Sequence, residues 1–165
     1  MRILMKLHAT QHLVEVGTLA GYSAISFARG MQPGGRVTSI ELDPRCAAFA
    51  RERIAKSDVA DRVHVIEGDA REVLPTLAED SADAIFIDAD KAGYPVYFEQ
   101  GCRIVRSGGL ILADNAFAFG QLLSEHPTDP GVGAIRAFNN VVAADDRVDA
   151  VIVPIGDGLW VGTLR

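Results

Sequence analysis

The chain has 165 residues, a formal net charge of −6 and a hydrophobic fraction of 48%. Its length is typical of one domain spanning residues 1–165, and its composition argues against disorder. The acidic balance argues against a nucleic-acid or anionic membrane partner, because both bind clustered Lys and Arg.

The cysteines and the start of the chain indicate the compartment. Cys46 and Cys102 have neither metal-site nor redox-motif spacing, so we expect reduced thiols. No apolar run is long enough to cross a bilayer, and Lys6 interrupts the apolar start, which makes a poor signal peptide. The sequence therefore predicts a cytoplasmic protein without a membrane partner.

The predicted elements alternate between helices and strands. From the N-terminus we expect a short helix at 2–10, a strand at 12–16, a helix at 22–29, a strand at 36–42, a helix at 43–57 and a strand at 63–67. The order continues with a short helix at 70–77, a strand at 84–87, a helix at 95–105, a strand at 110–113, a helix at 132–144 and closing strands at 150–154 and 159–163.

Local signals support several of these boundaries. Asp43 is a good N-cap and Pro44 a good first helical residue. The glycines of Ser107–Gly109 predict a left-handed C-cap for the helix before them, and Asp157-Gly158 predicts a hairpin between the closing strands. Repeated strand–helix alternation implies an α/β fold with a mostly parallel sheet, helices on both faces and, from the hairpin, one antiparallel strand.

Acidic residues follow or end the first five predicted strands. They are Glu15, Glu41, Asp69, Asp88 and Asp114. Each alone is often a cap or a solvated turn residue, but five at one sheet edge repel one another unless donors or cations offset them. Ligands of open α/β sheets bind at the carboxyl ends of the strands. We therefore expect the functional site at this edge.

The first strand–helix turn indicates the class of ligand. Gly17 permits a tight turn, Gly21 permits close approach of a ligand, and the N–H groups of Tyr22 and Ser23 can hold an anionic group. The spacing is G-x-x-x-G, so a dinucleotide pyrophosphate is only weakly supported, and simple turn chemistry is the alternative. Glu41 ends the second strand, where an acid binds ribose hydroxyls in any adenosine cofactor.

A second group combines Asp88 with Asp114 and Asn115. If the fourth and fifth strands are neighbours, these three side chains meet and offer only oxygen donors to an ion. Such a set favours a hard cation, Mg²⁺ first, with Mn²⁺ or Ca²⁺ as further candidates. An ordinary turn at Asp114-Asn115 is the alternative.

Four ordered motifs resemble one known family. Glu15–Ser23, Phe86–Lys91, Gly108–Asn115 and Pro154–Gly158 are similar to the cation-dependent O-methyltransferases, which include caffeoyl-CoA and catechol O-methyltransferases and the bacterial family 3 enzymes. The resemblance implies a Rossmann-like, S-adenosylmethionine-dependent methyltransferase fold with a seven-stranded sheet whose last strand is antiparallel.

The resemblance also implies residue roles. Gly17 and Ser23 would face the methionine end of S-adenosylmethionine, Glu41 the ribose, and Asp69-Ala70 the adenine. The full set of implied cofactor contacts is Glu15, Gly17, Thr18, Gly21, Tyr22, Ser23, Glu41, Leu42, Gly68, Asp69, Ala70 and Asp88. Asp88, Asp114 and Asn115 would bind the divalent cation, and Lys91 with Asp88 would form the catalytic pair.

The implied chemistry is methyl transfer to an oxygen, an in-line displacement that needs a nucleophilic oxygen held close to the methyl group. A divalent ion lowers the pKa of a bound hydroxyl, and a vicinal aromatic diol could chelate it. Lys91 would accept the acceptor's proton; its alternative role is an ordinary salt bridge to Asp88 or Asp90.

Two departures from the family fall on substrate recognition. Fewer residues precede His12 than is usual, and Ala118 stands where the family tends to have Trp. Phe117 and Phe119 could wall an aromatic acceptor or pack in the core. A homodimer is a further expectation from the resemblance. The competing hypotheses are a nicotinamide-dependent oxidoreductase and a cofactor-binding or oligomerising module without turnover.

Overall fold

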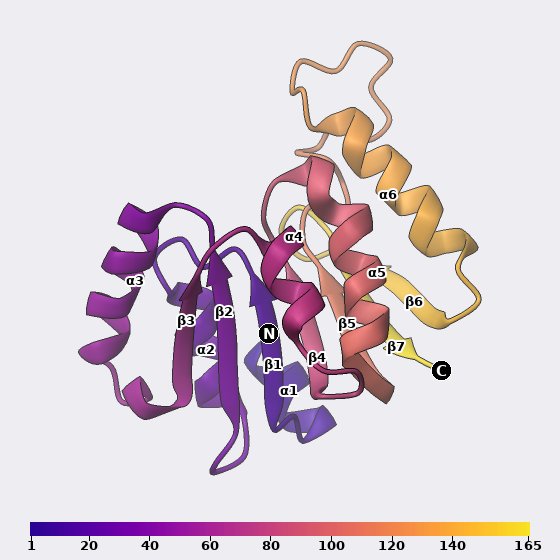
Figure 1. The fold of residues 1–165 in the computed structure, drawn as a ribbon. Coiled ribbons are helices and arrows are strands. Elements are labelled where there is room, and N and C mark those ends of the chain that lie inside the picture. The colour runs from indigo at the N-terminus through magenta and orange to yellow at the C-terminus, as the bar shows by residue number, and fades with distance from the viewer.

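The computed structural model describes residues 1–165 as one α/β sheet with helices around it (Figure 1). The helices are α1 (Arg2–His8), α2 (Tyr22–Gly30), α3 (Pro44–Ala55), α4 (Ala70–Val73), α5 (Tyr94–Ile104) and α6 (Val132–Ala144), with 3₁₀ turns at Ala60–Arg62, Leu74–Thr76 and Lys91–Gly93. The strands are β1 (His12–Val16), β2 (Arg36–Glu41), β3 (Val63–Glu67), β4 (Ala82–Ile87), β5 (Val105–Ala113), β6 (Val148–Val153) and β7 (Leu159–Leu164).

The seven strands lie in the order β3-β2-β1-β4-β5-β7-β6. β1 to β5 pair in parallel with their neighbours, whereas β7 is antiparallel to both β5 and β6. The fold class, the antiparallel last strand and the adjacency of the fourth and fifth strands are thereby confirmed. Since strand order reverses between β1 and β4, the carboxyl ends of these strands form the switch point where ligands of such sheets bind.

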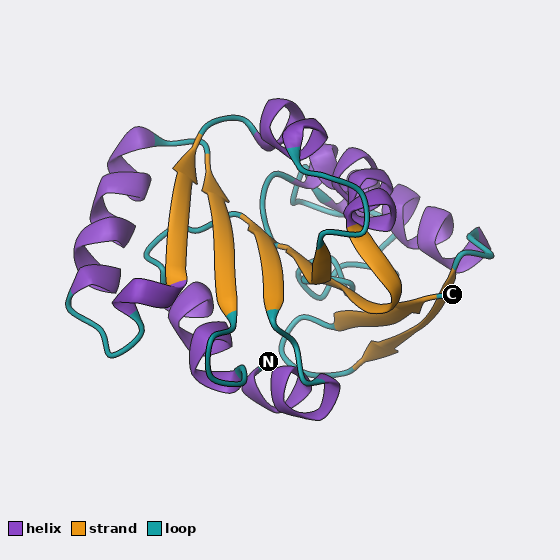
Figure 2. Cartoon of the chain, turned by 60° about the horizontal axis from the view of Figure 1, so that its bottom comes forward, coloured by secondary structure: helices purple, strands orange, loops and turns teal.

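Helices lie on both faces of the sheet (Figure 2), and alternation along the strands divides the core between two layers. In β1, Val14 and Val16 belong to the cluster that packs under α4, α5 and α6, whereas Leu13 packs with Phe27 of α2. In β4 the same alternation sends Ile85 to the first layer. Neighbouring strands are therefore buried on both sides, which explains their near-continuous apolar sequences.

The fifth strand corrects one prediction. Gly108 and Gly109 were expected to cap the preceding helix, but α5 ends at Ile104 with an extended C-cap at Val105. β5 starts at Val105 and runs through both glycines, with a register irregularity opposite Ala82 and Ala84. Gly108 adopts a φ of 75°, so its left-handed conformation serves a break in the strand pairing rather than a helix end.

Other boundaries follow their local signals closely. Asp43 caps α3 by accepting a hydrogen bond from the N–H of Arg45 at 2.8 Å.

Trp160 of β7 is buried and donates from Nε1 to Oδ1 of Asn139 in α6 at 2.7 Å, which ties the last strand to the last helix. None of the helices combines the length and the hydropathy needed to cross a membrane.

Candidate functional site

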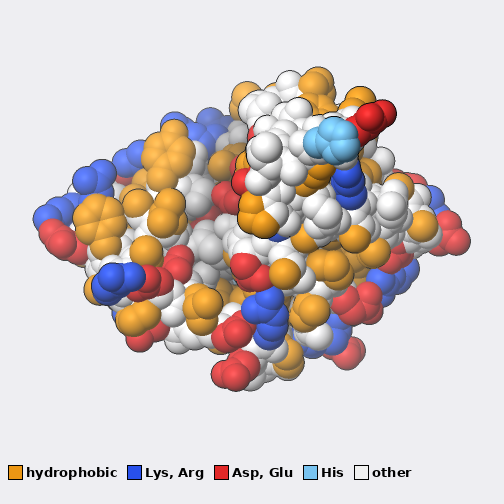
Figure 3. Space-filling model, turned by 90° about the horizontal axis from the view of Figure 1, so that it is seen from above, with side chains coloured by type: hydrophobic (Ala, Val, Ile, Leu, Met, Phe, Trp, Pro, Cys, Tyr) orange, Lys and Arg blue, Asp and Glu red, His pale blue; other side chains and the backbone are white.

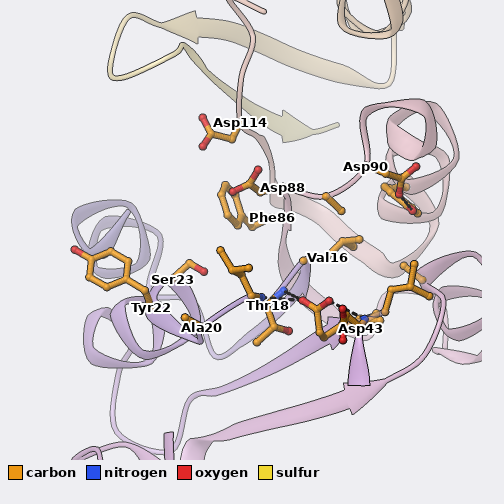
Figure 4. A pocket seen from close by; sticks show the side chains of 18 of the residues that line it. Val16, Thr18, Ala20, Tyr22, Ser23, Asp43, Phe86, Asp88, Asp90 and Asp114 are labelled. Atoms are coloured by element: carbon orange, nitrogen blue, oxygen red, sulfur yellow. Dashed lines mark hydrogen bonds between the residues drawn. The ribbon is translucent and has the colours of Figure 1, made fainter. Parts of the chain in front are cut away.

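A cavity of about 690 Å³ opens at the carboxyl ends of the first four strands. Acidic side chains surround the hollow when the molecule is viewed onto this edge (Figure 3). Asp88 and Asp114 lie at one end of the cavity, whereas Thr18 and Asp43 lie at the other (Figure 4). The site thus forms at the edge where the sequence predicted it.

Most of the predicted cofactor residues line this cavity. Those that do are Gly17, Thr18, Tyr22, Ser23, Glu41, Leu42, Gly68, Asp69, Ala70 and Asp88, and those that do not are Glu15 and Gly21. Lining residues that sequence reasoning missed include Leu19, Asp43, Phe86, Asp90 and Tyr97. Leu19, Phe86 and Asp90 lie within the motifs Glu15–Ser23 and Phe86–Lys91, a signal that could have found them, whereas Asp43 and Tyr97 lie outside these motifs.

The first turn has the geometry of a tight strand-to-helix connection. Gly17 has a φ of 95°, and a Cβ at this position would lie 2.1 Å from the carbonyl oxygen of Asp88. Gly21 caps α2 with a φ of 75°, but a Cβ there would meet the side chain of Ile54 at 3.2 Å. Gly21 therefore serves the turn and the packing of α2 on α3, and its role as a point of close ligand approach stays a prediction.

Glu41 organises the floor of the cavity. One carboxylate oxygen accepts the N–H groups of Thr18 at 3.1 Å and Leu19 at 2.8 Å, and the other accepts the N–H of Asp43 at 2.9 Å. A carboxylate offers about four lone-pair positions, so one stays open to a ligand hydroxyl. The residue therefore fits a ribose ligand and at the same time holds the glycine turn.

Glu15 differs from its prediction as a cofactor contact. Its side chain is fully buried beneath the turn, where one oxygen accepts the hydroxyl of Ser39 and Oε1 has no partner. Burial raises the pKa of Glu15 to about 7, against the opposing effect of hydroxyls at Ser23 and Ser39. In this structure Glu15 bonds Ser39 of β2 and does not line the cavity.

Asp90 connects the cavity wall to two elements. It accepts hydrogen bonds from the hydroxyl of Tyr97 at 2.5 Å and from Nη2 of Arg71 at 2.6 Å. The guanidinium of Arg71 also stands over the ring of Tyr97, 5.5 Å from its centroid. These contacts lock α4 against α5 beside Asp69, which caps α4. Asp90 is therefore engaged here and does not pair with Lys91.

Lys91 lies among oxygen atoms next to the acidic end of the cavity. Its Nζ is 3.3 Å from Oδ1 of Asp88, 2.6 Å from Oδ1 of Asn115 and 2.7 Å from the hydroxyl of Tyr94. Its side chain is only 15% exposed. An ammonium thus occupies the position between a carboxylate and an amide oxygen, both of which were predicted to bind a cation.

The donor set fits a hard cation. Asp114 follows Ala113 at the end of β5, and burial together with the charge of Asp88 raises the pKa of its carboxyl. Asn115 adopts a φ of 62°, an uncommon conformation that the surrounding contacts hold in place. No three His, Cys, Asp or Glu side chains converge closely enough to hold a metal ion. The predicted set has two carboxylates and one amide, and Lys91 shows that Asp88 and Asn115 turn oxygens toward a shared positive charge.

Asp157 joins this group from the distant β6–β7 turn. It accepts hydrogen bonds from Nδ2 of Asn115 at 3.1 Å, the N–H of Phe119 at 2.8 Å and the N–H of Gly120 at 3.1 Å. In the sequence this residue indicated a hairpin turn and belonged to the motif Pro154–Gly158, but no role in the site was assigned to it. Its contact with Asn115 spans 42 positions, so no local pattern could have revealed it.

Comparisons with known proteins agree on one family. The family model described as O-methyltransferase matches residues 1–164. A catechol O-methyltransferase from Niastella koreensis is 40% identical over 156 residues, covering 93% of this chain and 71% of the relative.

Solved structures give the same result. An O-methyltransferase from Bacillus cereus in complex with SAH superposes with a TM-score of 0.90 at 34% identity, covering 99% of this chain and 78% of that one. Cofactor-bound Rv0187 from MTB superposes with a TM-score of 0.93 at 34% identity, covering 99% and 77%.

Proposed function

This chain belongs to the O-methyltransferase family, and on that premise we propose that it methylates a hydroxyl of a small, catechol-like aromatic acceptor with the help of a divalent cation. Its dependence on S-adenosylmethionine and its activity as an O-methyltransferase follow from the family and from the bound cofactors of its structural relatives. These relatives do not favour the alternative of a nicotinamide-dependent oxidoreductase. The metal, the acceptor and the individual residue roles are the proposed part.

One observation carries the proposal. The cavity ends at Asp88 and Asp114, and directly beside it an ammonium is held between oxygens of Asp88 and Asn115. A cofactor compartment, an oxygen-rich cation position and a lysine are thereby adjacent. This combination supports acceptor binding at the acidic end of the cavity.

The residues divide into two functional sets. The glycine turn at Gly17, the carboxylate of Glu41 and the segment Gly68–Ala70 would hold the cofactor. Asp88, Asp114 and Asn115 would hold a divalent cation, Mg²⁺ first, through oxygen. When bound, S-adenosylmethionine supplies a sulfonium methyl group, and the cation supplies a charge that lowers the pKa of the acceptor hydroxyl.

Lys91 and the surrounding protein would handle the proton and the orientation. Lys91 would take the proton of the acceptor hydroxyl at Nζ, which requires the neutral amine. Rigid positioning of acceptor and methyl group contributes most of the rate gain in such displacements. The turn at Gly17, which approaches the carbonyl of Asp88 closely, and Asn115, which is held by Lys91 and Asp157, would provide that rigidity.

Phe119 is suited to contact an aromatic acceptor. Its side chain is 42% exposed, so the core alternative does not apply to it. Its Cε2 and the Cγ of Lys91 each lie 3.4 Å from the point where Gly131 would carry a Cβ, which places the ring near the lysine. Phe117 instead packs against Gly158 of the hairpin. We therefore assign Phe119, and not Phe117, to the acceptor wall.

Calorimetric titration tests the proposal in two steps. S-adenosylmethionine is titrated first, followed by a catechol acceptor with and without Mg²⁺. We expect cofactor binding in both buffers and acceptor binding only with Mg²⁺. Cofactor binding without any acceptor response would favour a module without turnover, and equal acceptor binding without Mg²⁺ would contradict the cation role.

Asp114→Ala provides the matching variant. It removes one proposed cation ligand but leaves the glycine turn and Glu41 intact, so Mg²⁺-dependent turnover should be lost while affinity for S-adenosylmethionine stays within a few-fold of wild type. Assays of turnover and of cofactor titration on the same preparation check this. Unchanged turnover in Asp114→Ala would contradict the assignment of Asp114 as a ligand of the cation.

A further inference from the structure

The β6–β7 turn is docked onto the segment that follows β5. Backbone bonds run from the N–H of Ala116 to the carbonyl of Gly158 at 2.9 Å and from the N–H of Phe117 to the carbonyl of Asp157 at 2.8 Å. The carboxylate of Asp157 adds three further bonds, to Asn115, Phe119 and Gly120. In Figure 1 this turn (yellow) reaches the same edge of the sheet as the end of β5.

The position of Asp157 determines which end of the Asn115 amide faces the site. An amide group presents an oxygen on one side and an NH₂ group on the other. Asp157 as a carboxylate can only accept, so the NH₂ group turns toward it, with 3.1 Å between Nδ2 and the carboxylate. The ammonium of Lys91 can only donate, and it holds Oδ1 at 2.6 Å. The two charges enforce the same orientation from opposite sides.

Only one of these two groups would still favour that orientation when a divalent cation is present. Lys91 bears the same sign of charge as the cation and competes with it for Oδ1 of Asn115. Asp157 bonds the opposite end of the amide and does not compete. Hard cations require the oxygen and not the NH₂ group. The hydrogen-bond acceptor at residue 157 therefore keeps the oxygen of Asn115 directed toward the cation.

We propose that Asp157 is a positioning residue of the cation site: it fixes the Asn115 amide with its oxygen toward Asp88 and holds the segment after β5 in place. This inference rests on the proposed function, because it assumes that Asn115 binds the cation. Outer partners of metal ligands commonly contribute tenfold to a hundredfold in metal affinity. Asp157 would contribute on that scale through Asn115.

An exchange of the two side-chain types tests the pairing. Asn115→Asp sets two carboxylates against each other, whereas the double variant Asn115→Asp with Asp157→Asn restores one acceptor, one donor and the original net charge. We expect Asn115→Asp and Asp157→Ala to weaken Mn²⁺ binding at least about tenfold. Adding Asp157→Asn to Asn115→Asp should strengthen it at least about tenfold, although Asp157→Asn alone does not strengthen the wild type.

Mn²⁺ affinity is measured from the electron paramagnetic resonance signal of the free ion, with S-adenosylhomocysteine present throughout. Circular dichroism and S-adenosylhomocysteine titration report whether each variant folds. If Asn115→Asp does not fold, Asp157→Ala and the double variant decide, and the double variant should bind Mn²⁺ within about tenfold of wild type. Equal Mn²⁺ affinity of Asn115→Asp and the double variant, or wild-type affinity of Asp157→Ala, would overturn the positioning role.

Asp114→Ala separates this outcome from failure of the proposed function. Loss of Mn²⁺ binding in Asp114→Ala, without coupling between residues 115 and 157, overturns only the role of Asp157. Mn²⁺ binding that is absent from the wild type, or equal in Asp114→Ala, overturns the cation site itself and the positioning role with it.

Discussion

Lys91 combines two properties that oppose each other in a general base. Oxygens of Asp88, Asn115 and Tyr94 surround its Nζ, and they stabilise an ammonium. A base must instead hold a free lone pair, so those oxygens need another positive partner during turnover. In the proposed mechanism, a bound cation would take over these oxygens and leave Lys91 to accept the proton of the acceptor hydroxyl.

Two substitutions of Lys91 separate charge from proton transfer. Lys91→Arg keeps the positive charge but does not release a proton at accessible pH, whereas Lys91→Met removes both. We expect both to reduce kcat by about a hundredfold to ten-thousandfold, because positioned acid–base groups contribute on that scale. Steady-state assays at saturating cofactor measure the effect, and titration of S-adenosylmethionine is the control. Near-wild-type turnover of Lys91→Arg would contradict the base role.

At the scale of elements, the glycine turn after β1 combines a positive φ with a close approach to β4. Gly17→Ala would add both backbone strain and a clash with the carbonyl of Asp88. Gly34→Ala would add only backbone strain, because Gly34 has a φ of 84° and nothing within 4 Å of its Cβ position. We expect Gly34→Ala to lower the free energy of unfolding by about 1 kcal/mol and Gly17→Ala by about 2 kcal/mol more.

Urea unfolding of the two variants measures this difference. Because both positions need a left-handed backbone, their shared strain cancels in the comparison and the contact with the carbonyl of Asp88 remains. Equal losses of stability at Gly17 and Gly34 would show that the turn can move away from β4 without cost.

The segment between β5 and α6 is held in place by an arginine of α6. Arg136 of α6 donates to the carbonyl oxygens of Gln121 at 3.2 Å, Leu122 at 2.8 Å and Ser124 at 2.5 Å. Arg136→Ala should therefore speed amide hydrogen exchange in this segment while the sheet keeps its protection. Arg165→Ala, which loses only an exposed pair with Asp149, is the control and should leave the segment unchanged. Unaltered exchange in Arg136→Ala would mean that the other bonds to the segment, from the β6–β7 turn and from Asn139, hold it without Arg136.

The helices and strands also show which element bounds can be predicted from local sequence patterns. β1, β3 and α6 match their predicted bounds, because apolar periodicity and capping residues act within a few positions. The start of β5 was missed because Gly108-Gly109 carries the signal of a helix end, whereas pairing with β4 decides the outcome. In the site, the predicted adjacency of β4 and β5 is confirmed, and Lys91 contacts both Asp88 and Asn115. The roles of Asp88, Asp114, Asn115 and Lys91 stay predictions.

What the sequence could not reveal depends on contacts across the fold. Asp157 reaches Asn115 from 42 residues away. Glu15 is fully buried within the fold, and the position of Gly21 follows from α3 packing beside it. The pattern of acids therefore predicted the edge of the sheet, but it did not tell which acids face the cavity and which lie beneath it.

At the scale of the whole molecule, surface carboxyl groups and the buried carboxyl group of Glu15 have opposite effects on how stability depends on pH. Hydrogen bonds from Arg29 and Arg147 lower the pKa values of Asp58 and Asp145. Such groups contribute stability that is present above their unfolded pKa and lost as the pH falls through the folded one. Glu15 acts in the other direction, because its pKa is raised from 4.5 to about 7 by burial. The effect of Glu15 on stability therefore falls near neutral pH, whereas the effects of Asp58 and Asp145 fall at acidic pH.

Glu15→Gln should therefore change how global stability depends on pH. Between pH 4.5 and about 7 the folded state retains a proton at Glu15 that the unfolded state releases, so the free energy of unfolding falls as the pH rises. A shift of this size corresponds to about 3 kcal/mol, an order-of-magnitude value. Gln stays uncharged and can still accept the hydroxyl of Ser39, so the variant lacks this loss.

The test is the difference in unfolding free energy between Glu15→Gln and wild type, measured by urea unfolding at several pH values. The surface carboxylates are present in both proteins and cancel in the difference. We expect it to grow by up to about 3 kcal/mol in favour of the variant as the pH rises from about 4.5 to 8. A constant difference would mean that Glu15 titrates alike in the folded and unfolded chain. The end of β1 would then contain a carboxyl group whose pKa burial does not raise.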